Sequence, residues 1–232
     1  MFYNCHDLKA TCSSFMLLFL LSSCTPTTGT KVLVDRSSLT KLQRLGVTVT
    51  KDEDFSVRLA REKTTNIGAV FGGLLGAGIE AAARSNTDTQ YAAQLKPVLI
   101  AYDPARLLTE GLLRHLQNEQ VFPTVVNVPA EEKNAVRGRG LDGVLEITLK
   151  QWGLRLCRGP NTEEKVQAGL HVEGRIVAVE KGQAMWERHE LYLDGECRTL
   201  EELRSQEGLL VNVLSRAIDH LSGKMVNEIR FP

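Results

Sequence analysis

Three segments between residues 141 and 193 constrain the fold more than any other feature of the sequence. Residues 141–157, LDGVLEITLKQWGLRLC, residues 169–179, GLHVEGRIVAV, and residues 184–193, AMWERHELYL, each alternate apolar with polar side chains. Such alternation is typical of strands with one buried face. The connections RGPNTEEK and EKGQ are rich in turn residues, so the sequence predicts a three-stranded antiparallel meander. Gly153 interrupts the first alternation and indicates a β-bulge there.

Two helix starts lie outside the meander. Asp103 and Pro104 supply a side-chain acceptor followed by a proline in the first turn, which predicts a helix near 104–119. Thr199 and Glu202 have the spacing of a capping box, which predicts the start of a C-terminal helix. Apolar side chains then repeat on one face of that helix, at Leu210, Leu214, Ala217, Leu221 and Met225.

Shorter apolar segments predict additional strands at 43–50, 55–60 and 121–128. We therefore expect an α+β fold. The meander and the additional strands form one sheet, and the helix near 104–119 and the C-terminal helix pack on it.

The first residues of the chain have the pattern of a signal peptide. Lys9 precedes an apolar segment at 15–21, and the small residues Ser22 and Ser23 follow it, before Cys24. The apolar segment is shorter than the roughly 20 residues that cross a bilayer as a helix. We therefore expect residues 1–23 to be removed on export.

Leu21-Ser22-Ser23-Cys24 resembles the lipobox of bacterial lipoproteins. The resemblance implies cleavage before Cys24 and lipid attachment to its thiol, palmitate included. In the known sorting pattern Thr25 implies the outer membrane, facing the periplasm. In the lipoprotein interpretation, residues 24–40 are a lipidated tether and residues 41–232 are a single periplasmic domain. The alternative is an ordinary secreted protein with a cysteine near its start.

Cysteine usage predicts a disulfide. Cleavage removes Cys5 and Cys12, and lipid occupies Cys24, so Cys157 and Cys197 remain as an even pair in an oxidising compartment. The meander places both at the same end of the sheet. The alternative is two unpaired thiols.

Residues 67–83, IGAVFGGLLGAGIEAAA, form an insert rich in glycine. Gly68, Gly72 and Gly76 are four residues apart and would share one face of a helix, as in a glycine zipper. The uncharged run ends at Glu80 and is too short to span a membrane. A dinucleotide loop would need a buried strand directly before it. We predict a helix-packing seam for self-association or membrane contact. The alternatives are packing inside the same domain and a mobile loop.

Composition and motifs disfavour several function classes. The 28 basic and 28 acidic side chains balance, and no basic run offers a nucleic-acid surface. No HExxH, GxSxG or GxxxxGK[ST] motif is present. The scattered histidines His115, His171, His189 and His220 have no metal-ligand spacing. His171 and Glu173 share a strand face, which is open to an acid–base role or a solvated surface. We predict no enzyme activity, metal or cofactor.

Within residues 100–228 a predicted helix precedes a short strand, a G-x-D-x-V-L segment opens the meander, and a hairpin carries a glycine followed by tryptophan. The residues of these two motifs are Gly140, Asp142, Val144, Leu145, Gly182 and Trp186. In these features the region resembles a broad class of envelope lipoproteins that includes the curli-assembly lipoprotein and the amino-terminal domain of TolB. The resemblance implies an α/β sandwich.

The leading hypothesis is a non-enzymatic outer-membrane lipoprotein that assists or assembles an envelope complex or transport machine. Its partners would be the membrane, through the lipid anchor, and a protein of the envelope or further copies of itself. One alternative is an oligomeric secretion-channel subunit. Another is a ligand-binding or enzymatic periplasmic domain with an unrecognised site.

Overall fold

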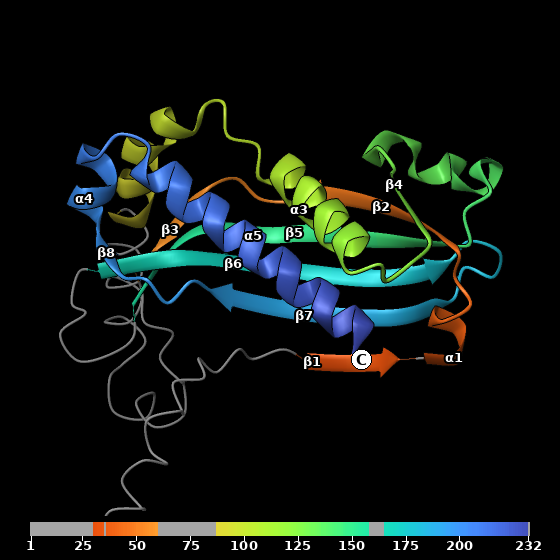
Figure 1. Cartoon of the computed structure of the whole chain (residues 1–232). Coiled ribbons are helices and arrows are strands. Elements are labelled where there is room, and N and C mark those ends of the chain that lie inside the picture. Colours follow the sequence, from red (N-terminus) through yellow and green to blue (C-terminus); the bar gives the residue numbers. More distant parts are fainter. Residues whose placement is uncertain (1–29, 35, 60–86, 158–164, 232) are drawn as a thin grey trace, which may run out of the picture.

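A mixed sheet of eight strands forms the centre of the structure (Figure 1). The structure is a computed structural model, and it describes residues 30–34, 36–59, 87–157 and 165–231. The strands are β1 (Thr30–Val34), β2 (Arg44–Lys51), β3 (Ser56–Arg58), β4 (Thr124–Asn127), β5 (Gly143–Leu156), β6 (Lys165–Ala178), β7 (Ala184–Leu193) and β8 (Arg198–Thr199). Their order is β1-β7-β6-β5-β2-β4, with β3 beside β5 and β8 beside β6.

The helices are α1 (Arg36–Leu39), α3 (Pro104–Asn118), α4 (Leu200–Ser205) and α5 (Leu209–Arg230). Residues 87–95 are also helical. Two 3-10 helices, η1 (Lys96–Leu99) and η2 (Ala130–Arg139), complete the described elements. The predicted α+β class is confirmed, with a helix at 104–118 and a C-terminal helix packed on the sheet.

The predicted meander is present as β5, β6 and β7, which pair antiparallel in sequence order. The predicted bulge is in the wrong place, because the register between β5 and β6 shifts between Leu149 and Gln151. Gly153 has another role. Its φ is +144°, and an added Cβ would lie 1.9 Å from the carbonyl oxygen of Ser56. Glycine at 153 therefore lets β3 approach β5 closely.

Parallel pairing extends the sheet beyond the meander. β2 lies between β5 and β4 and runs parallel to both. Asp142, just before β5, joins this corner: its Oδ2 accepts hydrogen bonds from the backbone N–H groups of Gln43 and Arg44, each at 2.8 Å. A polar side chain of the segment that opens the meander thus fixes the start of a strand about a hundred residues earlier.

The main core lies between the sheet and two helices, α3 and α5, which lie side by side across one face (Figure 1). α3 begins as predicted, because the Asp103 side chain accepts from the N–H groups of Ala105 and Arg106. Fully buried leucines at 108, 112 and 116 line its inner face. His115 Nε2 also lies 3.0 Å from Asp219 Oδ1 and links α3 to α5.

The C-terminal helix differs from the prediction at its start. Thr199 and Glu202 do form a capping box, but the helix that they cap is α4, which ends at Ser205. Gly208 has a φ of +73°, and α5 begins at Leu209. The break re-aims the chain, so that the predicted apolar face of α5 is buried on the sheet.

The predicted tether contains structure that the sequence did not indicate. β1 pairs antiparallel with β7, so the sheet already includes Thr30–Val34, and α1 follows within the same segment 24–40. This strand exists through its long-range partner, which local pattern cannot show. The signal peptide, Cys24, Gly68, Gly72 and Gly76 lie outside the described residues.

Candidate functional site

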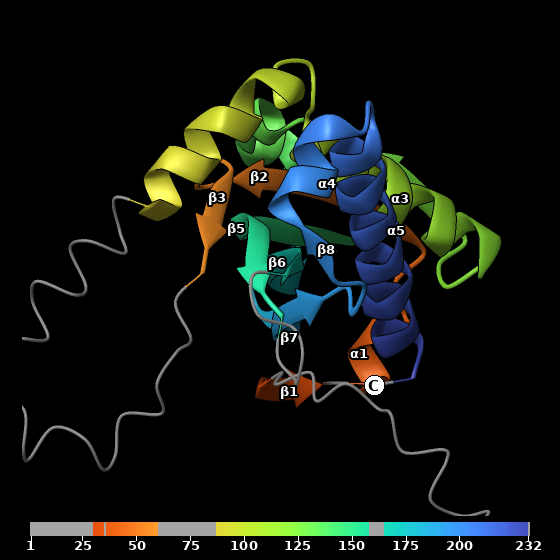
Figure 2. The same ribbon diagram turned by 90° about the vertical axis from the view of Figure 1, so that its left-hand side faces the viewer.

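The face of the meander opposite α3 and α5 is the candidate functional surface, which we call the open face. α3, α4 and α5 all lie on the other side of β5, β6 and β7 (Figure 2). Its polar side chains come from alternate positions of the three strands: Glu146, Lys150, His171, Glu173, Arg175, Glu187 and His189. Four of these side chains are between one third and one half exposed: Lys150, Glu173, Glu187 and His189.

Charges on the open face are paired across strands. Lys150 Nζ lies 2.8 Å from Asp52 Oδ2 and 3.3 Å from Glu173 Oε2. The hydrogen bond to Asp52, and next that to Glu173, raise the pKa of Lys150. His189 Nδ1 lies 3.4 Å from Glu173 Oε1. The surface therefore has a fixed mixed-charge pattern, and no single sign dominates it.

His171 and Glu173 share this face, as their spacing predicted. Burial lowers the pKa of His171, and the side chains of Arg155, His189 and Lys150 lower it further, against an opposing effect of Glu173. His171 is therefore neutral at neutral pH. The carboxylate of Glu173 already pairs with Lys150 and contacts His189, so this arrangement fits a polar recognition surface better than acid–base chemistry.

A second row of charges fixes α5 on β7. Three basic side chains at four-residue spacing on α5 face three polar side chains at two-residue spacing along β7 and just beyond it. The pairs are Arg216 with Asp194 (2.7 Å), His220 with Tyr192 (3.1 Å) and Lys224 with Glu190 (2.7 Å). Four residues of a helix rise by about 6 Å, and two residues of a strand rise by nearly the same distance, so the two rows of side chains stay in step. We call this row the helix–strand ladder. The basic spacing on α5 is visible in the sequence, but the partners on β7 that give it meaning are not.

The ladder contains two nearly inaccessible carboxylates. The side chains of Glu190 and Asp194 are 1% and 2% exposed. Glu190 Oε2 also accepts from Arg188, whose guanidinium in turn pairs with Glu228. Buried carboxylates with several cationic partners orient the elements that carry them. Together these contacts hold α5 in place over β7.

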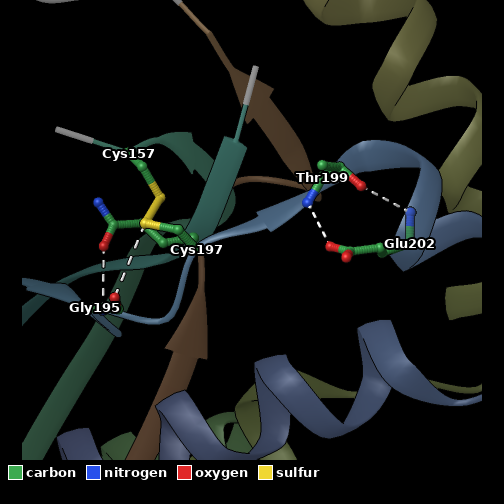
Figure 3. The surroundings of a disulfide bond; sticks show 6 residues. Cys157, Gly195, Cys197, Thr199 and Glu202 are labelled. Carbon is green, nitrogen blue, oxygen red and sulfur yellow. Dashed lines mark hydrogen bonds between the residues drawn. A yellow bond between two sulfur atoms is a disulfide. The ribbon is translucent and has the colours of Figure 1, made fainter. Parts of the chain in front are cut away.

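Cys157 and Cys197 form a disulfide, so the pairing inferred from the sequence is present (Figure 3). Cys157 follows β5 and Cys197 precedes β8, with their Cα atoms 6.1 Å apart. Cys157 is buried, and its N–H donates to the carbonyl of Lys165 at the start of β6. The bond therefore joins chain segments on both sides of β6.

Within the described residues, no group of three or more histidine, cysteine, aspartate or glutamate side chains is placed to hold a metal ion. The same part of the chain contains no helix that is both long and apolar enough to cross a bilayer. Cys24, Gly68, Gly72 and Gly76 are not described, so lipidation and helix packing by these residues stay predictions.

Neither a family model nor a curated protein sequence matches this chain. Among solved structures, the PelC dodecamer from Paraburkholderia phytofirmans is similar over 88% of this chain and 97% of its own, with 13% identity and a TM-score of 0.45. Protein XCC0632 from Xanthomonas campestris is similar over 86% and 90%, with 9% identity and a TM-score of 0.48.

Lipoprotein GNA1162 from Neisseria meningitidis is similar over 77% of this chain and 97% of its own, with 16% identity and a TM-score of 0.24. At TM-scores and identities this low, neither fold family nor function passes from these three proteins to this chain. The narrower resemblance to the curli-assembly lipoprotein and TolB stays a prediction.

Proposed function

We propose that this chain is a lipid-anchored protein of the bacterial envelope that acts without catalysis, as an accessory or assembly factor of an envelope complex. The observation that carries the proposal is the disulfide between Cys157 and Cys197. Disulfides persist in the periplasm and outside the cell but are rare in the cytosol. An exported domain agrees with the signal pattern and lipobox that end at Cys24.

The open face is the partner surface in this proposal. Its ion pairs between β5, β6 and β7 hold side chains such as Lys150 and Glu173 in fixed positions. Partly exposed, ordered charges favour recognition of one complementary surface over others, and they contribute more to specificity and association rate than to raw affinity. Thr25 favours the outer membrane, with the domain facing the periplasm.

Labelling with radioactive palmitate in a bacterial host tests the anchor. The full chain should incorporate label and fractionate with the outer membrane, whereas Cys24→Ala should lose both properties. Cys12→Ala is the matched control, because it removes a cysteine on the other side of the predicted cleavage site and should label normally. A Cys24→Ala protein that remains labelled and membrane-bound would refute the anchor.

A photo-crosslinking residue tests the partner surface in the same cells. Placed at His189 on the open face, it should give a discrete heavier adduct. Placed at Arg114, which is 55% exposed on the helix side, it should give none. Absence of an adduct at position 189 in an anchored protein would refute the open face as the binding surface.

A further inference from the structure

A cleft lies where α1, the loop after α3 and the end of α5 meet. The lining of the cleft is mixed. Its apolar side chains come from all three elements: Leu39, Val121, Phe122, Ile229 and Phe231. Its polar side chains are those of Thr40, Glu119, Gln120 and Arg230. Most of these apolar groups are buried, but Phe231 is 69% exposed. An exposed aromatic ring beside a cleft of mixed apolar and polar lining gives this corner the character of a contact surface.

The ring of Phe231 is paired with a cation. The guanidinium of Arg230 lies 4.9 Å from the ring centroid, and Arg230 also forms an ion pair with Glu119. An aromatic ring with a cation beside it suits the boundary between lipid headgroups and acyl chains, where one part enters the apolar layer and the other stays hydrated.

The lipid anchor of the proposed function lies close to this corner along the chain. Thr30, where β1 begins, is six positions after Cys24, and the chain between them spans at most about 20 Å when fully extended. β1 leads directly to α1, whose last residue, Leu39, lines the cleft. The domain is therefore held near the bilayer on the side where the chain enters it.

Charge near the anchor is asymmetric, although the whole chain is neutral. Residues 30–44 contain four basic residues, Lys31, Arg36, Lys41 and Arg44, against the single acidic residue Asp35. Lys41 and Arg44 are exposed. A basic side chain close to an anionic lipid surface contributes about 1 kcal/mol of attraction, which salt weakens.

We propose that this corner rests on the phospholipid leaflet that holds the anchor, with Phe231 in the headgroup–acyl boundary and Lys41 near anionic headgroups. The inference rests on the proposed lipid anchor. The acyl chains hold the protein on the membrane, and the second contact fixes how the domain stands on it. The open face would then be presented to its partner in one orientation.

A tryptophan placed at position 231 tests the contact. The full-length acylated Phe231→Trp protein is reconstituted into phosphatidylethanolamine–phosphatidylglycerol vesicles, with or without brominated acyl chains that quench tryptophan on contact. The native Trp152 and Trp186 are only 4% and 3% exposed, so they supply a constant background. Quenching of the added tryptophan should exceed that background several-fold.

Ile100→Trp is the matched control. Ile100 is 86% exposed and directly follows η1, coloured olive in Figure 1, at the opposite end of the molecule from α1. Its quenching should equal that of the unmodified protein. Equal quenching at positions 100 and 231, or none at 231, would overturn the proposal. A blue-shifted emission at 231 without quenching would also overturn it, because the ring would then contact protein.

Flotation of the same vesicles separates the two proposals. A protein that fails to float lacks the anchor and contradicts the proposed function itself. One that floats without quenching at 231 contradicts only the membrane contact. The charge contribution is tested by replacing phosphatidylglycerol with phosphatidylcholine, or by Lys41→Gln, either of which should reduce quenching. Unchanged quenching in both cases would refute the role of anionic headgroups.

Discussion

Reduction of the Cys157–Cys197 disulfide should destabilise the domain by an amount that the loop length sets. The bond closes a loop of 40 residues. In the chain-entropy model, a cross-link over such a loop lowers the entropy of the unfolded chain by about 13 cal/mol/K, which corresponds to about 4 kcal/mol at 25 °C. Reduction removes no side-chain atoms, so this value needs no correction for a cavity.

The measurement is urea unfolding of the same protein sample in its oxidised and reduced forms, followed by circular dichroism. With a denaturant dependence of about 2 kcal/mol per molar urea, the midpoint should fall by about 2 M. Cys157 is buried and Cys197 lies just before β8 and the capped helix α4, so the reduced form should also lose order first around α4. Hydrogen exchange at the amides of α4 reports this directly.

A destabilisation below about 1 kcal/mol would refute the reasoning, because the cross-link would then add little to a loop that other contacts already close. Thiol alkylation in cells checks the compartment. Both thiols should be protected in the full-length protein and accessible in a variant that lacks residues 1–23. Accessible thiols in both proteins would contradict export into an oxidising compartment.

Two matched pairs of substitutions test the packing. Glu190→Gln should lower the free energy of unfolding by about 2–3 kcal/mol, because it leaves partly buried cations without their carboxylate. Glu187→Gln, at a side chain that is 40% exposed on the same strand, should lower it by less than about 0.5 kcal/mol. Equal losses in urea unfolding would contradict the helix–strand ladder. Gly153→Ala should lower the free energy of unfolding by at least about 3 kcal/mol, because both a positive φ and the carbonyl of a neighbouring strand oppose a Cβ. Gly182→Ala, with a positive φ but no atom within 4 Å, should lower it by about 1 kcal/mol. Similar losses in melting experiments would show that the close approach of β3 is not the reason for glycine at 153.

Features that depend on local chemistry could be predicted from the sequence. The alternation in β5, β6 and β7, the cap at Asp103 and the capping box at Thr199 each act within a few residues, and all are present in the structure. The disulfide followed from counting cysteines and from the antiparallel meander, which brings the two ends together.

Features that depend on partners far away in the sequence could not be predicted from the sequence. β1 is a strand because β7 offers it an edge, and Gly153 is needed because β3 returns to that exact place. The division of the last helix into α4 and α5 likewise reflects the direction that α5 must take across the sheet. The cleft beside Phe231 combines three elements that are far apart in the sequence, so no motif could indicate it.

The two faces of β7 carry charged side chains of different kinds, one set buried under α5 and one set on the open face. Glu190 and Arg188 point under α5, where burial makes each charge dependent on its partners. Glu187 and His189 point to the open face, where solvent limits what each ion pair contributes to stability. Charges on the second face therefore add little to folding, and they are free to match a partner. Charge reversal at Glu187 should therefore leave the domain folded, whereas unfolding by that substitution would indicate a structural role for this side chain.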